Sequence, residues 1–487
     1  MDKKAHILKG RLILFSPAII GSGADNETDF DLLTDAEGKP FIPGTSMAGV
    51  LRSWCSKYIK DKSIIDQLFG SNGGKNPRSS LLLFSDMPIF KEKVGKRAGV
   101  KIDNRIGRAE EKKLYEYQVI EEGEFELRIE AKTGNKDEEE LVKKAFRCFN
   151  DLFREKIRIG AKTNSGYGEI GVPKNDNLDY YQFDLSKTDH LIYWLKREYD
   201  ERDKIEVTCL PAFELDQKKK FLIRVGFKLK TSLIIRDYSV NPYLPDAISL
   251  KTGEHFVISG TALKGALRSR AERILNTLGT DEKKTEELLN NLFGYVEEKN
   301  SSEGNRIANS GSTASAGGDE EKKARKGRLR VNEVKLKDYP AEQQTRIKID
   351  RFTGGTMSGA LLEEMPVFSK NDGQIFNVKI EVDDYKDWEA GLLLLLLKDL
   401  WTGDLPVGGE KAIGRGVFEG FQAEIVLGDS GKETTYLIKK GDDGKLSINK
   451  KTKDGENSDI KKCLEEINKL IKAIQEELEK KSGESNE

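Results

Sequence analysis

Histidine and cysteine are both scarce in this sequence, which limits the chemistry it can carry. The three histidines, His6, His190 and His255, are far apart along 487 residues and do not form a catalytic set. The four cysteines show no CxxC or Cys/His spacing that would close a zinc site. The sequence therefore points away from histidine catalysis and cysteine-bound zinc, and separate cysteines fit a reducing cytoplasm.

Long apolar runs are also missing. The leucine run that ends at Leu397 is far too short to span a bilayer. The N-terminal residues MDKKAHILKG lead straight into an alternating strand pattern, without the apolar segment of a signal peptide. We therefore expect a soluble cytoplasmic protein without a membrane partner.

Neither sign of charge is in excess, although charged residues make up 34% of the chain. The 82 Lys and Arg residues are balanced by 83 Asp and Glu residues, which gives a net charge of −1. A surface that binds a polyanion must therefore be a local group of basic residues. The length of 487 residues predicts two or three domains.

An internal repeat is the most informative feature of the sequence. Residues 41–52 (FIPGTSMAGVLR) return as residues 257–268 (VISGTALKGALR), and Leu-Phe-Gly at 68–70 returns at 292–294. Further along, Ile102, Asp103, Gly107 and Leu114 match Ile349, Asp350, Gly354 and Leu361, and Gly160, Gly166 and Gly168 match Gly408, Gly414 and Gly416. The chain therefore contains two diverged copies of one unit.

Each copy has the same order of expected elements, which predicts an α+β fold with antiparallel sheet. The expected segments are a first domain (1–185), a linker with a short helix (186–217), a second domain (218–427) and a polar tail ending in an amphipathic helix (428–487). That helix needs a surface to pack on, either its own domain or a neighbouring subunit. Residues 297–327 are rich in Ser, Gly, Glu and Lys, so we expect a disordered insertion there.

The Gly-Thr pairs at 44–45 and 260–261 place a hydroxyl N-cap where a helix is expected to begin. The exposed amides of such a helix can receive a phosphate, and Lys264 and Arg268 share one face of the second helix. An ordinary capped helix is the alternative. The candidate phosphate-binding residues are Thr45, Ser46 and Arg52 in the first copy and Thr261, Lys264 and Arg268 in the second.

The glycine-rich turns GAKTNSGYG (160–168) and GGEKAIGRG (408–416) allow a ligand to approach the backbone closely. A tight turn that needs positive φ explains one glycine in each turn, but three in the same frame suggest binding. The candidates here are Lys162, Gly166, Gly168, Lys411, Gly414, Arg415 and Gly416.

Two long excursions, 91–122 and 339–368, mix basic with apolar residues. That mixture suits a hairpin lying along a nucleic-acid backbone, although a solvated charged loop has a similar composition. The candidate RNA-binding residues are Lys101, Arg105 and Arg108 in the first excursion and Lys348 and Arg351 in the second.

Carboxylates are the remaining candidates for catalysis. Asp25, Asp29, Asp31 and Asp35 cluster just before the first Gly-Thr helix, and Asp237 and Asp246 lie in the corresponding loop of the second copy. A carboxylate there could activate a ribose 2′-hydroxyl or hold a divalent cation beside a phosphate. An acidic surface loop without chemistry is the alternative.

These motifs resemble the RAMP superfamily, specifically the backbone subunits of type III CRISPR effector complexes. The resemblance rests on TDFDLLTDAEGKPFIPGTSMAGVLRS, on VKIDNRIGRAEEKKLY and IKIDRFTGGTMSGALL, and on the two glycine-rich turns. It implies two tandem ferredoxin-like (RRM-like) RAMP domains, each with an inserted β-hairpin thumb, at about 87–122 and 338–368. Two such domains in one chain look like the fused double-backbone subunit of type III-D-like systems.

The resemblance also implies an activity. Such subunits bind CRISPR RNA beside other effector subunits and cleave complementary target RNA as metal-dependent endoribonucleases, with Mg²⁺ or another divalent cation. The family's cleaving aspartate falls on Asp29, with Asp31 next, and on Asp246 in the second copy; no metal ligands are assigned. The rival interpretations are a purely structural RNA-binding backbone and a CRISPR RNA-processing endoribonuclease, against which the doubled thumb argues.

Overall fold

The computed structural model describes most of the chain. The described residues are 3–23, 27–71, 77–103, 108–174, 176–197, 199, 204–237, 243–296, 324–371, 373–429, 432–441, 443–452, 455–457 and 459–479. Among the residues singled out above, Asp25, Arg105, Gly107 and positions 297–323 of the expected insertion lie outside this set.

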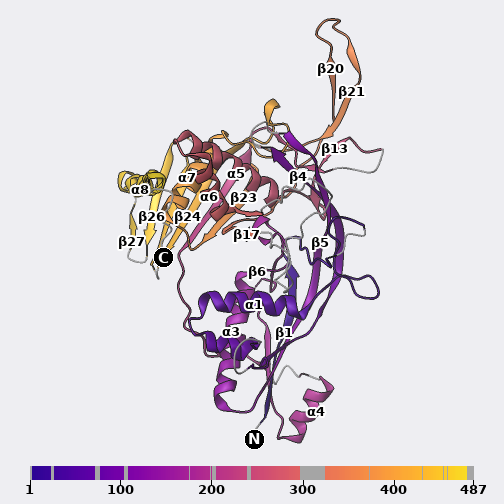
Figure 1. The fold of residues 1–487 in the computed structure, drawn as a ribbon, viewed down its shortest axis with the longest axis vertical. Helices are drawn as coiled ribbons and strands as arrows, with labels where there is room; N and C mark the ends of the chain where they lie inside the picture. Colours follow the sequence, from indigo (N-terminus) through magenta and orange to yellow (C-terminus); the bar gives the residue numbers. More distant parts are fainter. Residues whose placement is uncertain are drawn as a thin grey trace. The chain divides into compact units, whose positions relative to one another are not determined.

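The chain divides into two compact units, which are described separately (Figure 1). The first comprises Met1–Arg97, Glu116–Thr163 and Tyr167–Gln217, and the second comprises Ala98–Tyr115, Asn164–Gly166 and Lys218–Glu487. The change of unit near residue 217 lies within the expected linker, whose helix α4 covers Thr188–Lys196.

The first unit is built on a sheet in the order β2-β4-β5-β1-β7-β6, with β3 on β5, β8 on β1 and β9 on β8. The strands of this sheet are β1 Lys4–Leu14, β2 Phe41–Ile42, β3 Leu82–Phe84, β4 Met87–Asp103, β5 Arg108–Thr133, β6 Ile157–Arg158, β7 Glu169–Gly171, β8 Asp179–Asp184 and β9 Lys204–Ile205. The parts of β4 and β5 within Ala98–Tyr115 are grouped with the second unit. Its other helices are α1 Gly44–Tyr58, α2 Lys62–Phe69 and α3 Lys136–Glu155, with 3₁₀ turns at Thr163–Ser165 and Val207–Cys209.

Alternation and helical periodicity build the first core. Leu8 and Leu12 of β1 and Phe125 and Leu127 of β5 are buried in one cluster with the apolar faces of α1 and α3. Helix α3 begins after Asn135, whose side chain accepts a hydrogen bond from the Glu138 N–H, and has three acidic residues in its first turn.

The second unit contains a seven-stranded sheet in the order β18-β23-β10-β24-β25-β26-β27, and four smaller sheets. Its strands to β18 are β10 Lys220–Leu229, β11 Ser232–Leu233, β12 Arg236–Asp237, β13 Ala247–Ser249, β14 Lys251–Thr252, β15 His255–Ile258, β16 Gly294–Val296, β17 Ala324–Lys326 and β18 Leu329–Val331. The rest are β19 Val334–Leu336, β20 Gln344–Ile349, β21 Thr356–Met365, β22 Val367–Phe368, β23 Ile375–Asp383, β24 Phe418–Asp429, β25 Lys432–Lys440, β26 Leu446–Thr452 and β27 Gly455–Asn457. Its helices are α5 Gly260–Thr277, α6 Glu282–Phe293, α7 Asp387–Thr402 and α8 Ile460–Glu479, with a 3₁₀ turn at Lys411–Ile413.

The expected mixture of helices and mostly antiparallel sheet is confirmed in both units. The expected polar tail differs, because β25 and β26 pair in sequence onto β24 and extend the main sheet. Their outward faces are polar, which hid them in the composition. The end of the expected insertion also differs, since β17 pairs with β16.

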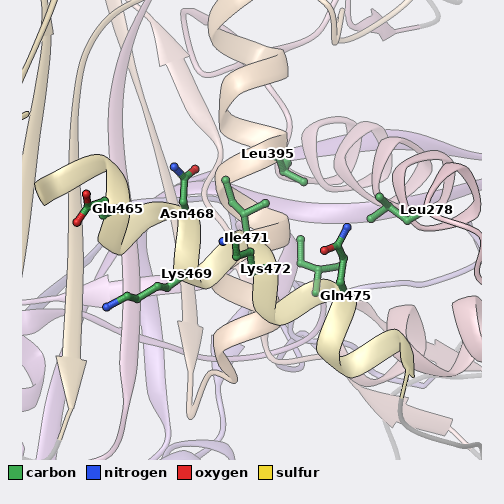
Figure 2. Close-up of a pocket in the computed structure, with 9 residues that line it drawn as sticks. Leu278, Leu395, Glu465, Asn468, Lys469, Ile471, Lys472 and Gln475 are labelled. Carbon is green, nitrogen blue, oxygen red and sulfur yellow. The ribbon is translucent and has the colours of Figure 1, made fainter. Parts of the chain in front are cut away.

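Helix α8 packs on its own unit, the first of the two alternatives. Its residues Cys463 and Ile474 are buried in the core cluster that contains α7. Figure 2 shows Ile471 of α8 lining a pocket with Leu395 of α7 and Leu278 at the end of α5. The leucine run that ends at Leu397 lies in α7 and is mostly buried, and no helix among the described residues is long and apolar enough to cross a membrane.

Candidate nucleic-acid interface

Asp29 lies half-buried beside the strand β5. Its Oδ2 accepts a hydrogen bond of 2.7 Å from the backbone N–H of Glu116. The next residue along, Phe30, forms a parallel bridge with Tyr117 of β5. The carboxylate is therefore held by the backbone of the strand that forms one side of the first excursion.

Asp246 is held in the same way in the second unit. Its Oδ2 accepts a hydrogen bond of 3.1 Å from the N–H of Glu363, and the next residue, Ala247, pairs in parallel with Glu364 of β21. Glu363 follows Glu116 by 247 residues, the spacing found for the excursion motifs. Asp29 and Asp246 therefore occupy equivalent positions in the two copies.

Asp31 has a different environment from Asp29. It is 8% exposed, and its carboxylate accepts hydrogen bonds from the N–H groups of Glu27 and Thr28 and from the Thr28 hydroxyl. These bonds close the loop on itself, which explains Asp31 as a loop-shaping residue.

Metal ligands were not assigned from the sequence, and the described residues contain no group of three His, Cys, Asp or Glu side chains that could hold an ion. A single carboxylate is nevertheless a usual protein ligand for Mg²⁺, which takes further oxygens from substrate phosphates and water. Asp29 could therefore bind a cation only if substrate phosphates and water supplied the remaining ligands.

The N-caps differ from those expected. Helix α1 begins after Pro43 and α5 after Ser259, so the threonines stand one position inside each helix. The hydroxyl of Ser259 accepts from the N–H of Ala262, whereas the N–H of Gly44 donates to the Asp86 carboxylate at 2.8 Å. Thr45 is exposed, and Ser46 and Thr261 are half-buried.

The basic residues of these helices are partly engaged. Arg268 donates to the carbonyl of Gly294 and to the Asn290 side chain, both at 2.7 Å, so it also fastens α5 to the end of α6. Arg52 contacts Asp66 at 3.3 Å. Burial, together with the positive charges of Arg268 and Lys326, lowers the pKa of Lys264 to about 8. Three cations thus meet at α5, an arrangement that an anion would stabilise.

All three glycines of each turn are explained by the backbone, contrary to the expectation that only one would be. Each of the six has positive φ. A Cβ on Gly168 or on Gly416 would lie 1.9 Å from the carbonyl oxygen of Ile159 or Val407, respectively. The glycine pattern therefore specifies the turn, and it carries no separate evidence for a ligand.

The charged residues of the turns divide into two groups. Arg415 is 3% exposed and donates to Glu410, Ser232 and Gln344, so its guanidinium faces the protein interior. Lys162 is half-buried with its Nζ 3.5 Å from the centre of the Tyr117 ring, and burial lowers its pKa to about 7. Lys411 is exposed at the surface.

The second excursion is a hairpin of β20 and β21 that extends from its unit (Figure 1). Several of its apolar residues are exposed, including Phe352 at 99%. Three exposed apolar positions recur in the first excursion, formed by β4 and β5: Val100, Ile102 and Leu114 correspond to Ile347, Ile349 and Leu361. Among the basic candidates, Lys101, Arg108, Lys348 and Arg351 are exposed.

A largely buried cluster lies beside each turn, and of its members the sequence pointed only to Arg415, as a residue for RNA binding. It consists of Arg97, Tyr117 and Tyr167 in the first unit and of Gln344, Glu364 and Arg415 in the second. The spacing of 247 or 248 residues relates these positions. Because the residue types differ between the copies, similarity of sequence could not show the correspondence.

Comparison with known proteins agrees with the repeat and with the superfamily suggested by its motifs. The family model described as RAMP superfamily matches residues 11–170 and again residues 227–419. A search of curated proteins found no match. The two matched regions together cover most of the chain, one in each copy. The chain therefore belongs to the RAMP superfamily, which is associated with CRISPR-related RNA-binding proteins, and contains two RAMP domains.

Proposed function

We propose that this protein is the double backbone subunit of an RNA-guided type III CRISPR effector. It binds CRISPR RNA beside other effector subunits and cleaves the paired target RNA at Asp29 and Asp246. The observation that carries the proposal is the equivalent support of these two aspartates by the N–H groups of Glu116 and Glu363. Two carboxylates held alike imply two similar cleavage sites.

The hairpins supply the second part of the argument. Exposed apolar side chains at matched positions, such as Ile102 and Ile349, have no core to pack against. Such residues suit the thumbs of a ferredoxin-like RAMP domain, where they would stack against splayed bases while Lys101, Lys348 and Arg351 contact phosphates. Each thumb continues from the strand that holds the aspartate, so a base displaced by the thumb would leave its ribose near the carboxylate.

The chemistry follows from this placement. With one oxygen fixed by a backbone N–H, the Asp29 carboxylate has a defined direction from which it could orient or deprotonate a ribose 2′-hydroxyl. Mg²⁺ would supply charge stabilisation at the phosphate, with Asp29 as its protein ligand and RNA oxygens as others.

Basic residues on α1 and α5 would hold the guide. Arg268 and Lys326 each act on Lys264 with a like charge, and an RNA phosphate beside Lys264 would relieve this repulsion. Thr45, Ser46, Thr261, Arg52 and Lys411 would add contacts along the same backbone. Sequence choice would come from base pairing, because these groups contact only phosphate and sugar.

Asp29→Asn and Asp246→Asn test this function in the assembled effector. Asparagine keeps an oxygen that can accept from the Glu116 or Glu363 N–H but loses the negative charge. Each substitution is expected to slow one discrete cut of a guide-matched RNA by at least about 100-fold, the range for a catalytic acid or base. Binding of the same RNA should not change, and chelation of divalent cations should abolish both cuts.

Asp35→Asn is the matched control, because Asp35 lies in the same loop and accepts backbone N–H bonds from Glu37 and Lys39. It is expected to leave every cut intact. If neither Asp29→Asn nor Asp246→Asn removes a cut, the protein is a structural backbone without catalysis. Cutting that persists in chelator would exclude the metal-dependent form of the mechanism.

A further inference from the structure

In the first unit, the residue that follows the aspartate-holding amide reaches the glycine-rich turn. Glu116 donates its N–H to Asp29, and the hydroxyl of the next residue, Tyr117, lies 2.8 Å from the hydroxyl of Tyr167. Tyr167 stands between Gly166 and Gly168, and both tyrosines are buried. One hydrogen bond therefore joins the turn to the strand segment that holds the aspartate.

The second unit makes the same connection between a carboxyl group and a guanidinium. Glu363 donates its N–H to Asp246, and the carboxylate of the next residue, Glu364, lies 3.4 Å from the Arg415 guanidinium. Arg415 stands between Gly414 and Gly416, and both charged side chains are buried.

A third residue, from the other strand of each hairpin, completes both contacts. Arg97 of β4 donates to the Tyr167 hydroxyl at 3.1 Å, and Arg415 donates to the Gln344 side chain of β20 at 2.8 Å. Arg97 and Gln344 are 247 residues apart, as are Tyr117 and Glu364. The two units thus share one three-part contact, built from different residue types.

We propose that Tyr167 and Arg415 are positioning residues for target-RNA cleavage, each fixing the aspartate of its own unit relative to the glycine-rich turn. This inference rests on the cleavage function proposed above. Neither residue needs to touch RNA, because each acts through the neighbouring residue of the strand that holds the carboxylate.

The physical basis is the stiffness of a buried polar contact. A buried hydroxyl or charge that loses a partner is costly, so each contact favours one separation of the turn and the hairpin strands. Glu364 also lies 3.1 Å from Arg346 and 3.3 Å from Arg236, and Arg415 is the partner that belongs to the turn. A displacement of about 1 Å at a reacting group can cost about 100-fold in rate. The two units use different residue types at the same three positions. This indicates that the distance between the turn and the strand matters more than the charge of the residues that join them.

Tyr167→Phe and Arg415→Lys test the proposal in the assembled effector. Phenylalanine keeps the ring and removes the hydroxyl that bonds Tyr117 and Arg97. Lysine keeps the positive charge near Glu410 but cannot reach Ser232, Gln344 and Glu364 together. Tyr167→Phe is expected to slow the Asp29-dependent cut about tenfold, and Arg415→Lys the Asp246-dependent cut, with RNA binding and the other cut unchanged.

Tyr199→Phe is the matched control, since the Tyr199 hydroxyl also accepts from an arginine, Arg128, while its ring packs on Tyr181 and Phe183 of β8. It should leave both cuts at the wild-type rate. Adding Tyr167→Phe to Asp29→Asn should cause no further loss, because a positioning residue has no effect once its carboxylate is neutral.

The outcomes separate the two proposals. If Asp29→Asn and Asp246→Asn leave the cuts intact, the cleavage function itself fails. If they remove the cuts but Tyr167→Phe and Arg415→Lys stay within twofold of wild type, the positioning role is overturned. It is also overturned if each variant slows both cuts equally, which would indicate general destabilisation.

Discussion

His6 shows how a single buried side chain makes the first unit sensitive to acid. The ring is fully buried, with Nδ1 2.9 Å from the Tyr180 hydroxyl and Nε2 3.0 Å from the Thr133 hydroxyl. It therefore links three strands, β1, β5 and β8. Burial lowers the pKa of His6 to about 4, despite an opposing contribution from Glu139.

This lowered pKa predicts a loss of stability in acid. Between pH 6.5 and 4 the unfolded chain binds a proton at His6 that the folded chain does not, so the stability present above pH 6.5 falls as the pH is lowered. The full effect on the free energy of unfolding is about 3 kcal/mol, because a tenfold change in proton affinity corresponds to roughly 1.4 kcal/mol. Thermal unfolding at pH 7 and pH 5 should show about 2 kcal/mol of this loss, because the part between pH 5 and pH 4 is not covered.

His6→Gln should be less stable than wild type at pH 7, because the packing of the imidazole ring is lost. It should lose less stability than wild type between pH 7 and pH 5. His255→Gln, a change in the second unit, is the control and should keep the wild-type acid loss. If His6→Gln and wild type lose the same stability between pH 7 and pH 5, His6 is not the source of the acid sensitivity.

Contacts of single residues distinguish Asp29 from Asp31, which are two positions apart. The family resemblance ranked Asp29 first, but the sequence offered no physical reason for that order. The folded structure gives them different partners. The Asp31 carboxylate accepts hydrogen bonds from Glu27 and Thr28 within the loop, whereas the Asp29 carboxylate accepts one from Glu116 outside it. Such a distinction depends on a contact between residues 87 positions apart.

At the scale of elements, the contact between α7 and α8 depends on the absence of a side chain. A Cβ on Gly391 of α7 would lie 2.1 Å from the Leu470 carbonyl oxygen of α8. Glycine inside a helix is otherwise unfavourable relative to alanine. The close approach of the two helices explains why glycine is present.

Gly391→Ala is therefore expected to destabilise the second unit by about 1–3 kcal/mol, the usual cost of overpacking, against its helix-propensity gain of roughly 1 kcal/mol. Gly265→Ala in α5 is the matched control, since a Cβ there meets no atom within 4 Å. It should leave the melting temperature unchanged or raise it slightly. A rise in melting temperature for Gly391→Ala would refute the close contact.

For the whole molecule, the repeat allows RNA contacts to be moved from one unit to the other. Lys264 in α5 corresponds to Ala48 in α1, so the two units differ by one cation at this position. Lys264→Ala should reduce the steepness of log K against log salt by about 0.7 for a single-stranded guide, because one phosphate contact is lost. Arg268 is left intact because it also supports α6.

The reciprocal variant is Ala48→Lys, which should steepen the same plot by a similar amount if both units bind the guide through equivalent helices. Filter binding of the guide RNA at several salt concentrations measures both slopes. A slope that is unchanged in Lys264→Ala would remove α5 from the RNA interface.

The sequence by itself determined the duplication, the mixed α/β character and the positions of the helix, hairpin and turn motifs. These follow from patterns of apolar residues, glycine and charge, which can be recognised in the sequence without knowledge of the fold. The assignment of the cleaving role to Asp29 and Asp246 came from the resemblance to the RAMP superfamily and not from these patterns.

The tertiary structure alone decided what those residues contact. Gly168 and Gly416 are required because a Cβ there would clash with the backbone of Ile159 and Val407. Arg415 faces the protein interior, and the C-terminal segment adds strands to the main sheet of the second unit. The contact of Tyr117 with Tyr167 and its counterpart, Glu364 with Arg415, could not be predicted because each joins residues about 50 apart. Burial and pairing depend on which distant segments meet, and that information enters only when the chain folds.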